Sequence, residues 1–348
     1  MVTAEVATRL WSEDHPVLDV LRARRQDGST PAQRAARGDE IKVGVAVEGG
    51  GMRAAVSAAM LTALDDLGMV PAFDAVYGSS SGALNGAYFL AGEGQSWWNL
   101  TIYFDDLPNK TFLDFTRQLR GESILNLDYA FEEVMERRKP LDFERALASE
   151  VRLGVVITSV PDQKTVLVDR FDDRDDLKAA LRASTWMPGA VRGTATFRGE
   201  RALDGVVLQA HPWRAAALDG CTHILSLSTH TLFETRRYNP IALRYAVRYL
   251  DKIGPGLGAG YVQSLRDNDD EHVPFLQRSM TDPTPGPYVL NLGPLPGAPT
   301  IKRHEMDRAA LVDGARHGYE VMYAAIENLP PPEPGSPSRV VPRLTFRP

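Results

Sequence analysis

The sequence has very little cysteine: Cys221 is its one example among 348 residues. An internal disulfide is therefore excluded, and so is a cysteine-rich zinc or iron–sulfur site. No run of 18 apolar residues occurs, which argues against a membrane-spanning helix. The first residues lack a basic start followed by an apolar run, so we expect no signal peptide.

The sequence also lacks an excess of basic residues. Asp and Glu total 45 against 39 Lys and Arg, giving a net charge of −6. This balance argues against a general nucleic-acid-binding protein. With 43% apolar residues, the chain can bury a large core and needs no disulfide or metal ion to stabilise it. We expect a cytoplasmic protein that could contact a membrane surface.

Strand and helix patterns alternate at the start of the main part of the chain. Residues 41–47 form a short apolar run rich in β-branched residues, as in a buried parallel strand. Three glycines follow, and then apolar residues recur at helical spacing from Val56 to Leu67. Residues 73–78 predict a second strand, and residues 78–92 a tight turn entering a helix. This order predicts an α/β fold with three layers, in which helices cover both faces of a mainly parallel sheet.

The rest of the chain is divided by composition. Residues 1–40 are predicted as a polar arm, with a short helix around Val17–Leu21 and a loop after it. Residues 41–329 are predicted as one domain with lid-like helical insertions at about 93–145 and 231–285, and residues 330–348 as a disordered proline-rich tail. Further elements are predicted within the domain: hairpins at 152–169 and 195–205, helices at 176–185, 241–253 and 304–329, and a strand at 222–228.

A serine lies at the junction of the second strand and its helix. Gly78-Ser79-Ser80-Ser81-Gly82 fits the pattern G-x-S-x-G, with Ser80 at its centre. On a sharp strand-to-helix turn, the hydroxyl of such a serine stands exposed near the helix N-terminus, where developing negative charge is favoured. Gly78 and Gly82 would let the strand and the helix approach closely. The alternative is a plain loop of small residues.

The glycine loop after the first strand is the second chemical signal. Gly49, Gly50 and Gly51 leave backbone N–H groups able to converge on an oxyanion, and Arg53 could brace the loop or add positive charge. Because parallel strands end at the same edge of a sheet, this loop and Ser80 can meet. The glycines also fit a dinucleotide-binding fingerprint, but the expected acidic residue at the end of the second strand is missing.

A serine nucleophile needs a base. In the usual α/β-hydrolase order an acidic residue and then a histidine follow the serine, so a triad with Asp204 and His230 is possible. Asp219, which also precedes a glycine, is a weaker candidate and is predicted as the turn before the next strand. As an alternative to a catalytic role, Asp204 could be a turn residue of a hairpin.

Taken together, the glycine loop with Arg53, the serine motif about thirty residues later and the distant Asp204-Gly205 resemble the patatin-like phospholipase family. The resemblance covers roughly residues 41–230 and includes the segments VAVEGGGMRAAVSAAMLTALDDLG, FDAVYGSSSGALNGAYFLAG, LRASTWMPGAV and RALDGVVLQAHPWRAAALDGCTHILSLST. The sequence departs from the family pattern at Ala54, Val206 and the stretch 209–212. These departures suggest a divergent subfamily.

The resemblance implies a patatin-like three-layer fold and a Ser-Asp dyad without histidine. Ser80 would be the nucleophile and Asp204 the base, with Gly49, Gly50, Gly51 and Arg53 in the oxyanion region. It implies a serine acyl hydrolase acting on carboxylic esters of lipids through an acyl-enzyme, with no metal and no cofactor. An acyltransferase using the same acyl-enzyme, or a binding module on a decayed hydrolase scaffold, are the alternatives.

Two surface features have a functional and a structural interpretation. The predicted helix 241–253 carries Arg244, Arg248 and Lys252 four residues apart, which suits anionic lipid head groups or a solvated face of a helix packed on the sheet. Four aromatic residues after the serine helix could line a lid or acyl-chain pocket, or belong to the core: Trp97, Trp98, Tyr103 and Phe104.

Overall fold

A computed structural model describes residues 10–92, 94–231, 233 and 238–333, and its centre is one eight-stranded sheet. The strands are β1 (Val43–Val47), β2 (Ala75–Ser79), β3 (Arg152–Ser159), β4 (Lys164–Val168), β5 (Ala195–Phe197), β6 (Glu200–Asp204), β7 (His223–Leu227) and β8 (Tyr288–Leu292). Strands β3, β2, β1, β7 and β8 run parallel, whereas β4, β5 and β6 add antiparallel pairs at one end. The predicted mainly parallel α/β sheet is confirmed.

One edge of β3 is shared by two other strands. β2 pairs with its first half, up to Val156, and β6 pairs with its remaining residues, from Ile157 onwards. β4 also pairs with this second half, so it must occupy the opposite edge. β2 and β6 therefore meet end to end: Ser79 lies opposite Val156, and Asp204 lies opposite the next residue, Ile157.

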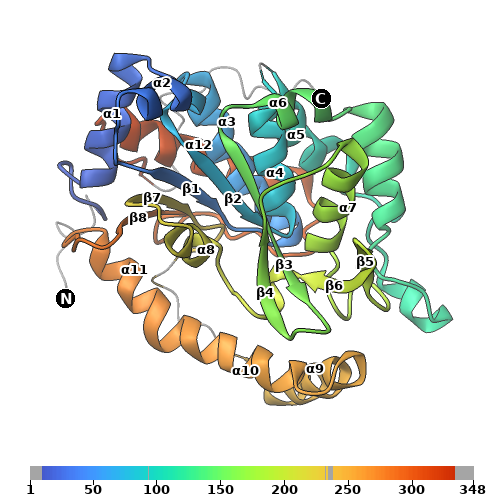
Figure 1. Ribbon diagram of the computed structural model, residues 1–348. Helices are drawn as coiled ribbons and strands as arrows, with labels where there is room; N and C mark the ends of the chain where they lie inside the picture. The colour runs from blue at the N-terminus through green and yellow to red at the C-terminus, as the bar shows by residue number, and fades with distance from the viewer. Residues whose placement is uncertain (1–9, 93, 232, 234–237, 334–348) are drawn as a thin grey trace.

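Helices cover both faces of the sheet, as Figure 1 shows. One layer comprises α3 (Ala55–Asp66), α4 (Ser81–Leu90), α5 (Gln95–Thr101), α6 (Phe143–Ala148), α7 (Arg174–Ser184) and α12 (Arg308–Ile326). On the other face, α8 (Trp213–Leu218) packs on β1 and β7, and α11 (Val273–Ser279) packs on β8. The predicted three-layer architecture is confirmed.

Further helices and short 3-10 and π-helical segments complete the described part of the chain. They are α1 (Pro16–Asp27), α2 (Pro31–Ala36), α9 (Pro240–Ile253), α10 (Leu257–Asp267), the 3-10 segments η1 (Gly51–Ala54), η2 (Val70–Ala72), η4 (Phe115–Arg120) and η6 (Gly205–Val207), and the π-helical segments η3 (Ile102–Asp106), η5 (Tyr129–Arg138) and η7 (Asn268–His272). The largely helical character predicted for residues 93–145 is confirmed in the described residues.

Several predictions differ from the structure. The loop predicted after the first helix contains α2, which Thr30 begins with a capping box to Gln33. The closing helix begins at Arg308 instead of residue 304, because Asp307 caps it there. β8 was not predicted, because a five-residue strand has no strong periodic pattern. Helix α8 lies in the segment that resembles the family's Asp-Gly strand, helix and following strand, and α10 and α11 lie within the predicted helical insertion at 231–285. Most of the predicted tail, residues 334–348, lies outside the described residues.

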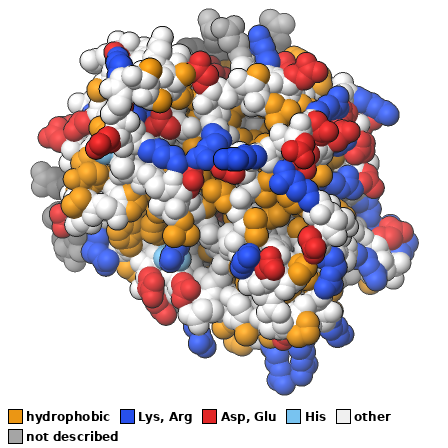
Figure 2. Space-filling view, in the orientation of Figure 1, with side chains coloured by type: hydrophobic (Ala, Val, Ile, Leu, Met, Phe, Trp, Pro, Cys, Tyr) orange, Lys and Arg blue, Asp and Glu red, His pale blue; other side chains and the backbone are white. Residues whose placement is uncertain are grey.

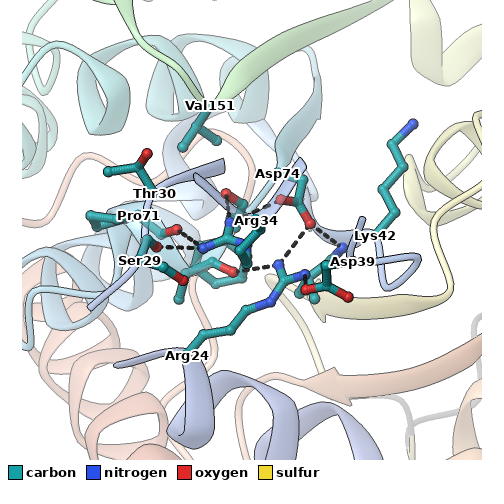
Figure 3. A network of polar contacts seen from close by, with 12 residues as sticks. Arg24, Ser29, Thr30, Arg34, Asp39, Lys42, Pro71, Asp74 and Val151 are labelled. Carbon is teal, nitrogen blue, oxygen red and sulfur yellow. Dashed lines mark hydrogen bonds and ion pairs between the residues drawn. The ribbon is translucent and has the colours of Figure 1, made fainter. Parts of the chain in front are cut away.

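The polar N-terminal segment is built into the fold through two buried arginines (Figure 3). Arg24 on α1 and Arg34 on α2 both bind the carboxylate of Asp74, at 2.7 and 2.8 Å. Asp74 also accepts the N–H of Val43 at 2.7 Å, at the start of the sheet. Burial opposes ionisation of Asp74, but these donors outweigh it and hold the pKa of the carboxyl below its ordinary value.

Helix α9 lies at the lower edge of the molecule in Figure 1 and is mostly solvated. Of its residues only Leu250 is buried, in a small cluster with Leu203 and Val207, and the main partner of the helix is α10. Ile241 is 82% exposed and Tyr245 is 70% exposed. Figure 2 shows basic side chains projecting from the same lower edge, with hydrophobic side chains beside them. The predicted helix is confirmed; it touches the sheet only near its C-terminal end, where Leu250 packs on Leu203 of β6 and Arg201 donates to the carbonyl oxygen of Ile253.

No helix among the described residues has both the length and the apolar character needed to cross a bilayer.

Because Asp74 holds two buried guanidinium groups, we expect Asp74→Ala to lower the free energy of unfolding by about 3 kcal/mol. Urea denaturation followed by circular dichroism measures this loss. Asp39→Ala is the matched control, since Asp39 is more exposed and binds only one of the two arginines, Arg24, at 3.3 Å. It should cost clearly less, and equal losses in the two variants would contradict the role given to Asp74.

Candidate active site

Ser80 occupies a strained turn between β2 and α4. Its backbone has φ 55° and ψ −139°, a conformation that residues with a side chain rarely adopt. The glycines on both sides make the turn possible. A Cβ on Gly78 would lie 2.4 Å from the Cα of Ala83, and one on Gly82 would lie 2.2 Å from the carbonyl oxygen of Val47. The expected sharp strand-to-helix turn is therefore present, and steric contact explains both glycines.

The glycine loop touches this turn directly. A Cβ on Gly49 would lie 2.7 Å from the Cβ of Ser80, so only glycine fits there. The N–H of Gly50 donates to the hydroxyl of Ser81 at 3.1 Å, which ties the loop to the first residue of α4. Gly51 has φ 60°, a left-handed conformation suited to glycine, and its N–H has no acceptor in the part of the chain that the structure describes.

Asp204 reaches the same place from the end of β6. Its side chain is completely buried, and its Oδ1 accepts the N–H of Val206 at 3.0 Å. A Cβ on Gly205 would lie 2.5 Å from the carbonyl oxygen of Val156. The glycine of this Asp-Gly pair thus lets the chain pass close to β3, and Asp204 does not lie in a hairpin turn.

A glycine loop, a serine turn and a distant Asp-Gly pair converge at one edge of the sheet in this chain. The sequence profile of the patatin-like phospholipase family matches residues 45–217, about half of the chain, and this segment contains all three. This chain belongs to the patatin-like phospholipase family.

Curated members of the family align with part of the chain. Mouse patatin-like phospholipase domain-containing protein 5 is 27% identical over 221 residues, covering 58% of this chain and 48% of the mouse protein. The human protein of the same name is 30% identical over 146 residues, covering 40% of this chain and 31% of that protein. The chain thus matches less than half of the length of either relative.

Solved structures that are similar to this chain are more distant in sequence. VipD from Legionella pneumophila has a TM-score of 0.41 at 12% identity, over 83% of this chain and 67% of VipD. Human GIVD cytosolic phospholipase A2, in complex with methyl gamma-linolenyl fluorophosphonate and terbium chloride, has a TM-score of 0.42 at 14% identity, over 88% of this chain and 62% of that chain.

In this patatin-like site the buried carboxyl of Asp204 titrates near neutrality. Burial raises its pKa to about 7, and the N–H of Val206, the Ser80 hydroxyl and the charge of Arg303 only partly offset that effect. The Ser80 hydroxyl lies near this carboxyl, but Asp204 Oδ2 is buried without a hydrogen-bond partner among the described residues. Catalytic hydrogen bonds are often long before substrate binds.

A second buried carboxylate, Glu48, braces the glycine loop from the other side. Its Oε2 accepts the N–H and the hydroxyl of Thr229, at 2.6 and 2.9 Å, and contacts Nδ1 of His230 at 3.1 Å. Burial would raise the pKa of Glu48, but the charges of His230, Arg53 and His211 outweigh it and hold the pKa well below its ordinary value. Glu48 is therefore a fixed negative charge under the loop.

Arg53 belongs to this brace. Its Nε donates to the hydroxyl of Thr229 at 3.0 Å, and its Nη2 lies 3.9 Å from Glu48 Oε1. Its side chain is absent from the wall of the cavity that contains Ser80. Of the two roles considered for Arg53, the geometry suits bracing of the loop.

The alternative bases lie elsewhere. His230 contacts Glu48, and because Asp204 Oδ2 has no partner among the described residues, no histidine links it to Ser80. Asp219 lies at the opposite end of the strands, where it binds Lys42 at 2.8 Å and also contacts Tyr77 and Arg152. A triad with His230 is therefore not assembled, and Asp219 is a structural residue.

A cavity of about 360 Å³ opens at Ser80. Its walls are mainly apolar and come from the helical insertion and from α4; they include Leu84, Leu107, Phe112, Leu113, Leu127, Phe131, Val134 and Met135. Of the four aromatic residues considered earlier, Tyr103 lines the cavity and Phe104 is core, whereas Trp97 binds Asp66 and Trp98 is 45% exposed. The site thus offers a deep apolar space beside a serine hydroxyl.

Sequence reasoning missed several polar residues that hold the site. Ser184 accepts the N–H of Ser80 at 2.9 Å and donates to the carbonyl of Val156 at 2.7 Å. Ser81 and Glu48 lie next to the recognised motifs, but their partners come from other segments. For Glu48 the available signal was position, because a polar residue directly follows the buried strand β1. No group of three or more metal-binding side chains occurs in residues 10–92, 94–231, 233 or 238–333.

Burial of Asp204 should make the fold less stable as the pH rises. In the folded state its pKa is about 7, against 3.8 for the free group, so stability falls between about pH 4 and 7. Asp204→Asn removes the ionisation and can still accept from Val206. At pH 8 we expect it to raise the free energy of unfolding by on the order of 4 kcal/mol, and by less at pH 5. Urea denaturation at both pH values measures the difference.

Asp219→Asn is the matched control for this test. Burial opposes ionisation of Asp219, but Lys42, Tyr77 and Arg152 outweigh it and lower the pKa of its carboxyl. The control should therefore lose stability at pH 8. If Asp204→Asn were no more stable than wild type at pH 8, the penalty assigned to the ionised carboxylate would be wrong.

Proposed function

We propose that the protein is a serine acyl hydrolase that cleaves carboxylic esters of lipids through a Ser80–Asp204 dyad. The observation that carries this proposal is the end-to-end meeting of β2 and β6, which brings a buried carboxyl with a pKa of about 7 to a strained, cavity-facing serine. Membership of the patatin-like phospholipase family supports lipid esters as the substrate class.

The reaction would begin with attack of Ser80 Oγ on the ester carbonyl carbon. Asp204 Oδ2 takes the hydroxyl proton as the new bond forms, and a tetrahedral intermediate results. Its collapse expels the alcohol, which takes that proton, and leaves an acyl group on Ser80. Water then attacks the acyl-enzyme with Asp204 again as base, and free fatty acid and Ser80 are released. A base with a pKa close to the working pH is suited to both steps.

The oxyanion of the intermediate would be held by the glycine loop. Gly51 lines the cavity and its N–H has no acceptor among the described residues, whereas the N–H of Gly50 is bonded to Ser81. Glu48, Thr229 and Arg53 fix the loop from beneath, so its donors need little rearrangement during the reaction. The apolar cavity would take the acyl chain and exclude water from it.

Labelling with a fluorophosphonate probe tests the dyad. We expect a single adduct on Ser80 by intact mass and peptide mapping, none in Ser80→Ala, and labelling slowed by about a hundredfold or more in Asp204→Asn. Wild-type labelling should accelerate from pH 6 to pH 8, because Asp204 must be ionised to act as base.

Asp219→Asn serves as a control in the same experiment and should label at the wild-type rate if it folds. Normal labelling of Asp204→Asn would move the base to another residue, and no adduct on folded wild type would refute the hydrolase proposal. Release of free fatty acid, against transfer of the acyl group to added alcohol, separates hydrolysis from acyl transfer.

We further propose that α9 contacts anionic membrane surfaces. Its solvated face combines Arg244, Arg248 and Lys252 with the exposed apolar side chains of Ile241 and Tyr245. Basic residues beside an exposed tyrosine suit the head-group region of a bilayer. A neighbouring contact supports proximity to the site: Gly260 on α10 packs on Leu208, two residues beyond the cavity-lining Val206.

Arg248→Glu should therefore weaken binding to vesicles that contain phosphatidylserine by about tenfold, since each basic residue near such a surface contributes about 1 kcal/mol. Binding is measured by co-sedimentation. Vesicles of pure phosphatidylcholine, and a second series at higher salt, show how much binding remains when the electrostatic attraction is removed or screened. Arg145→Glu, on α6 at the top of Figure 1, is the matched control and should bind as wild type does. Equal binding by Arg248→Glu would exclude α9 from the contact.

A further inference from the structure

The wall of the Ser80 cavity contains one fixed positive charge among the described residues. That charge is Arg303, which lies with His304 in the loop before α12. The cavity also contains one carboxylate, Glu48, but Thr229, His230 and Arg53 already bind it. An anionic group entering the cavity would therefore meet Arg303 as its available cation.

The position of Arg303 is fixed by the glycine loop. The N–H of Met52 donates to the carbonyl oxygen of Arg303 at 3.0 Å. A Cβ on Gly51 would lie 2.6 Å from the same oxygen, so the two backbones are in direct contact. The loop proposed to supply the oxyanion donors thus also fixes the position of the Arg303 backbone, from which the side chain extends.

The side chain itself is available to a ligand. Arg303 is exposed, and its guanidinium forms no ion pair or hydrogen bond with any residue in the described ranges. It lies close enough to Asp204 for its charge to favour the ionised carboxyl. A cation within reach of the base lies within reach of groups attached to the reacting ester.

We propose that Arg303 binds a phosphodiester group next to the scissile ester and so selects phospholipids over neutral glycerides. The proposal rests on the hydrolase function proposed above and assigns this specificity to a residue outside the matched segment 45–217. A planar guanidinium suits the task, because it can donate two parallel hydrogen bonds to phosphate oxygens. Since the phosphate of a phospholipid follows the glycerol carbons, one arginine at the cavity mouth can reach it while the acyl chain lies inside.

The test compares two esters with the same acyl chains. Dihexanoyl phosphatidylcholine and dihexanoylglycerol are both used as monomers, so that binding to a lipid surface plays no part. We expect Arg303→Ala to lower kcat/KM for the phospholipid by about 10- to 100-fold and for the diacylglycerol by no more than about threefold. Arg303→Lys should keep part of the preference, because it keeps the charge but loses the paired hydrogen bonds.

Lys302→Ala is the matched control, since Lys302 is the neighbouring exposed cation and lies outside the cavity wall. It should leave the ratio of the two substrates unchanged, and fluorophosphonate labelling of Ser80 checks that each variant is folded. If Arg303→Ala reduces both activities equally and shifts the pH profile, Arg303 acts through Asp204 and the proposal is wrong. An unchanged substrate ratio in an active enzyme also refutes it. If wild type cleaves neither ester, the hydrolase proposal fails with it.

Discussion

The site depends on one constraint in the sheet: β2 and β6 share a single edge of β3. Because β2 ends at Ser79, the edge is vacant from Ile157 onwards, and β6 fills it from the opposite direction. The last residue of β6 must then arrive where the chain leaves β2. Glycine is required wherever the two chain ends and the loop crowd together, as contacts at Gly78, Gly82 and Gly205 demonstrate.

Two buried carboxylates at this edge have opposite electrostatic environments. Glu48 is surrounded by donors and cations, and its pKa is lowered. Asp204 has one backbone donor and an unpartnered oxygen among the described residues, and its pKa is raised. The first fixes a loop and gains from its charge; the second is costly to ionise and for that reason readily accepts a proton. A difference in partners, not in burial, separates a structural group from a candidate base.

The sequence predicted the parts of this arrangement that depend on local sterics. Three motifs can be read directly from the sequence: a serine between close glycines, three glycines after a buried strand, and an Asp-Gly pair. The structure brings all three together. Ser184, Thr229 and Arg303 could not be found in this way, since each acts on a motif from a distant segment. Helix α2 was missed because Thr30 and Gln33 form its cap inside a polar stretch, and β8 because a five-residue strand after a proline-rich loop has no periodic signal.

The N-terminal helices also connect the beginning and the end of the described fold. Arg22 on α1 donates to the carbonyl oxygens of Ala325 and Ile326 at the end of α12, at 2.8 and 3.0 Å, while Arg24 reaches Asp74 beside the first strands. During synthesis on the ribosome, α1 emerges about 300 residues before its partner on α12. Arg22 on α1 can therefore bind its acceptors only after the end of α12 has formed. The contact between α1 and α12 therefore joins two segments that are far apart in the chain, and it can form only after α12 has been synthesised.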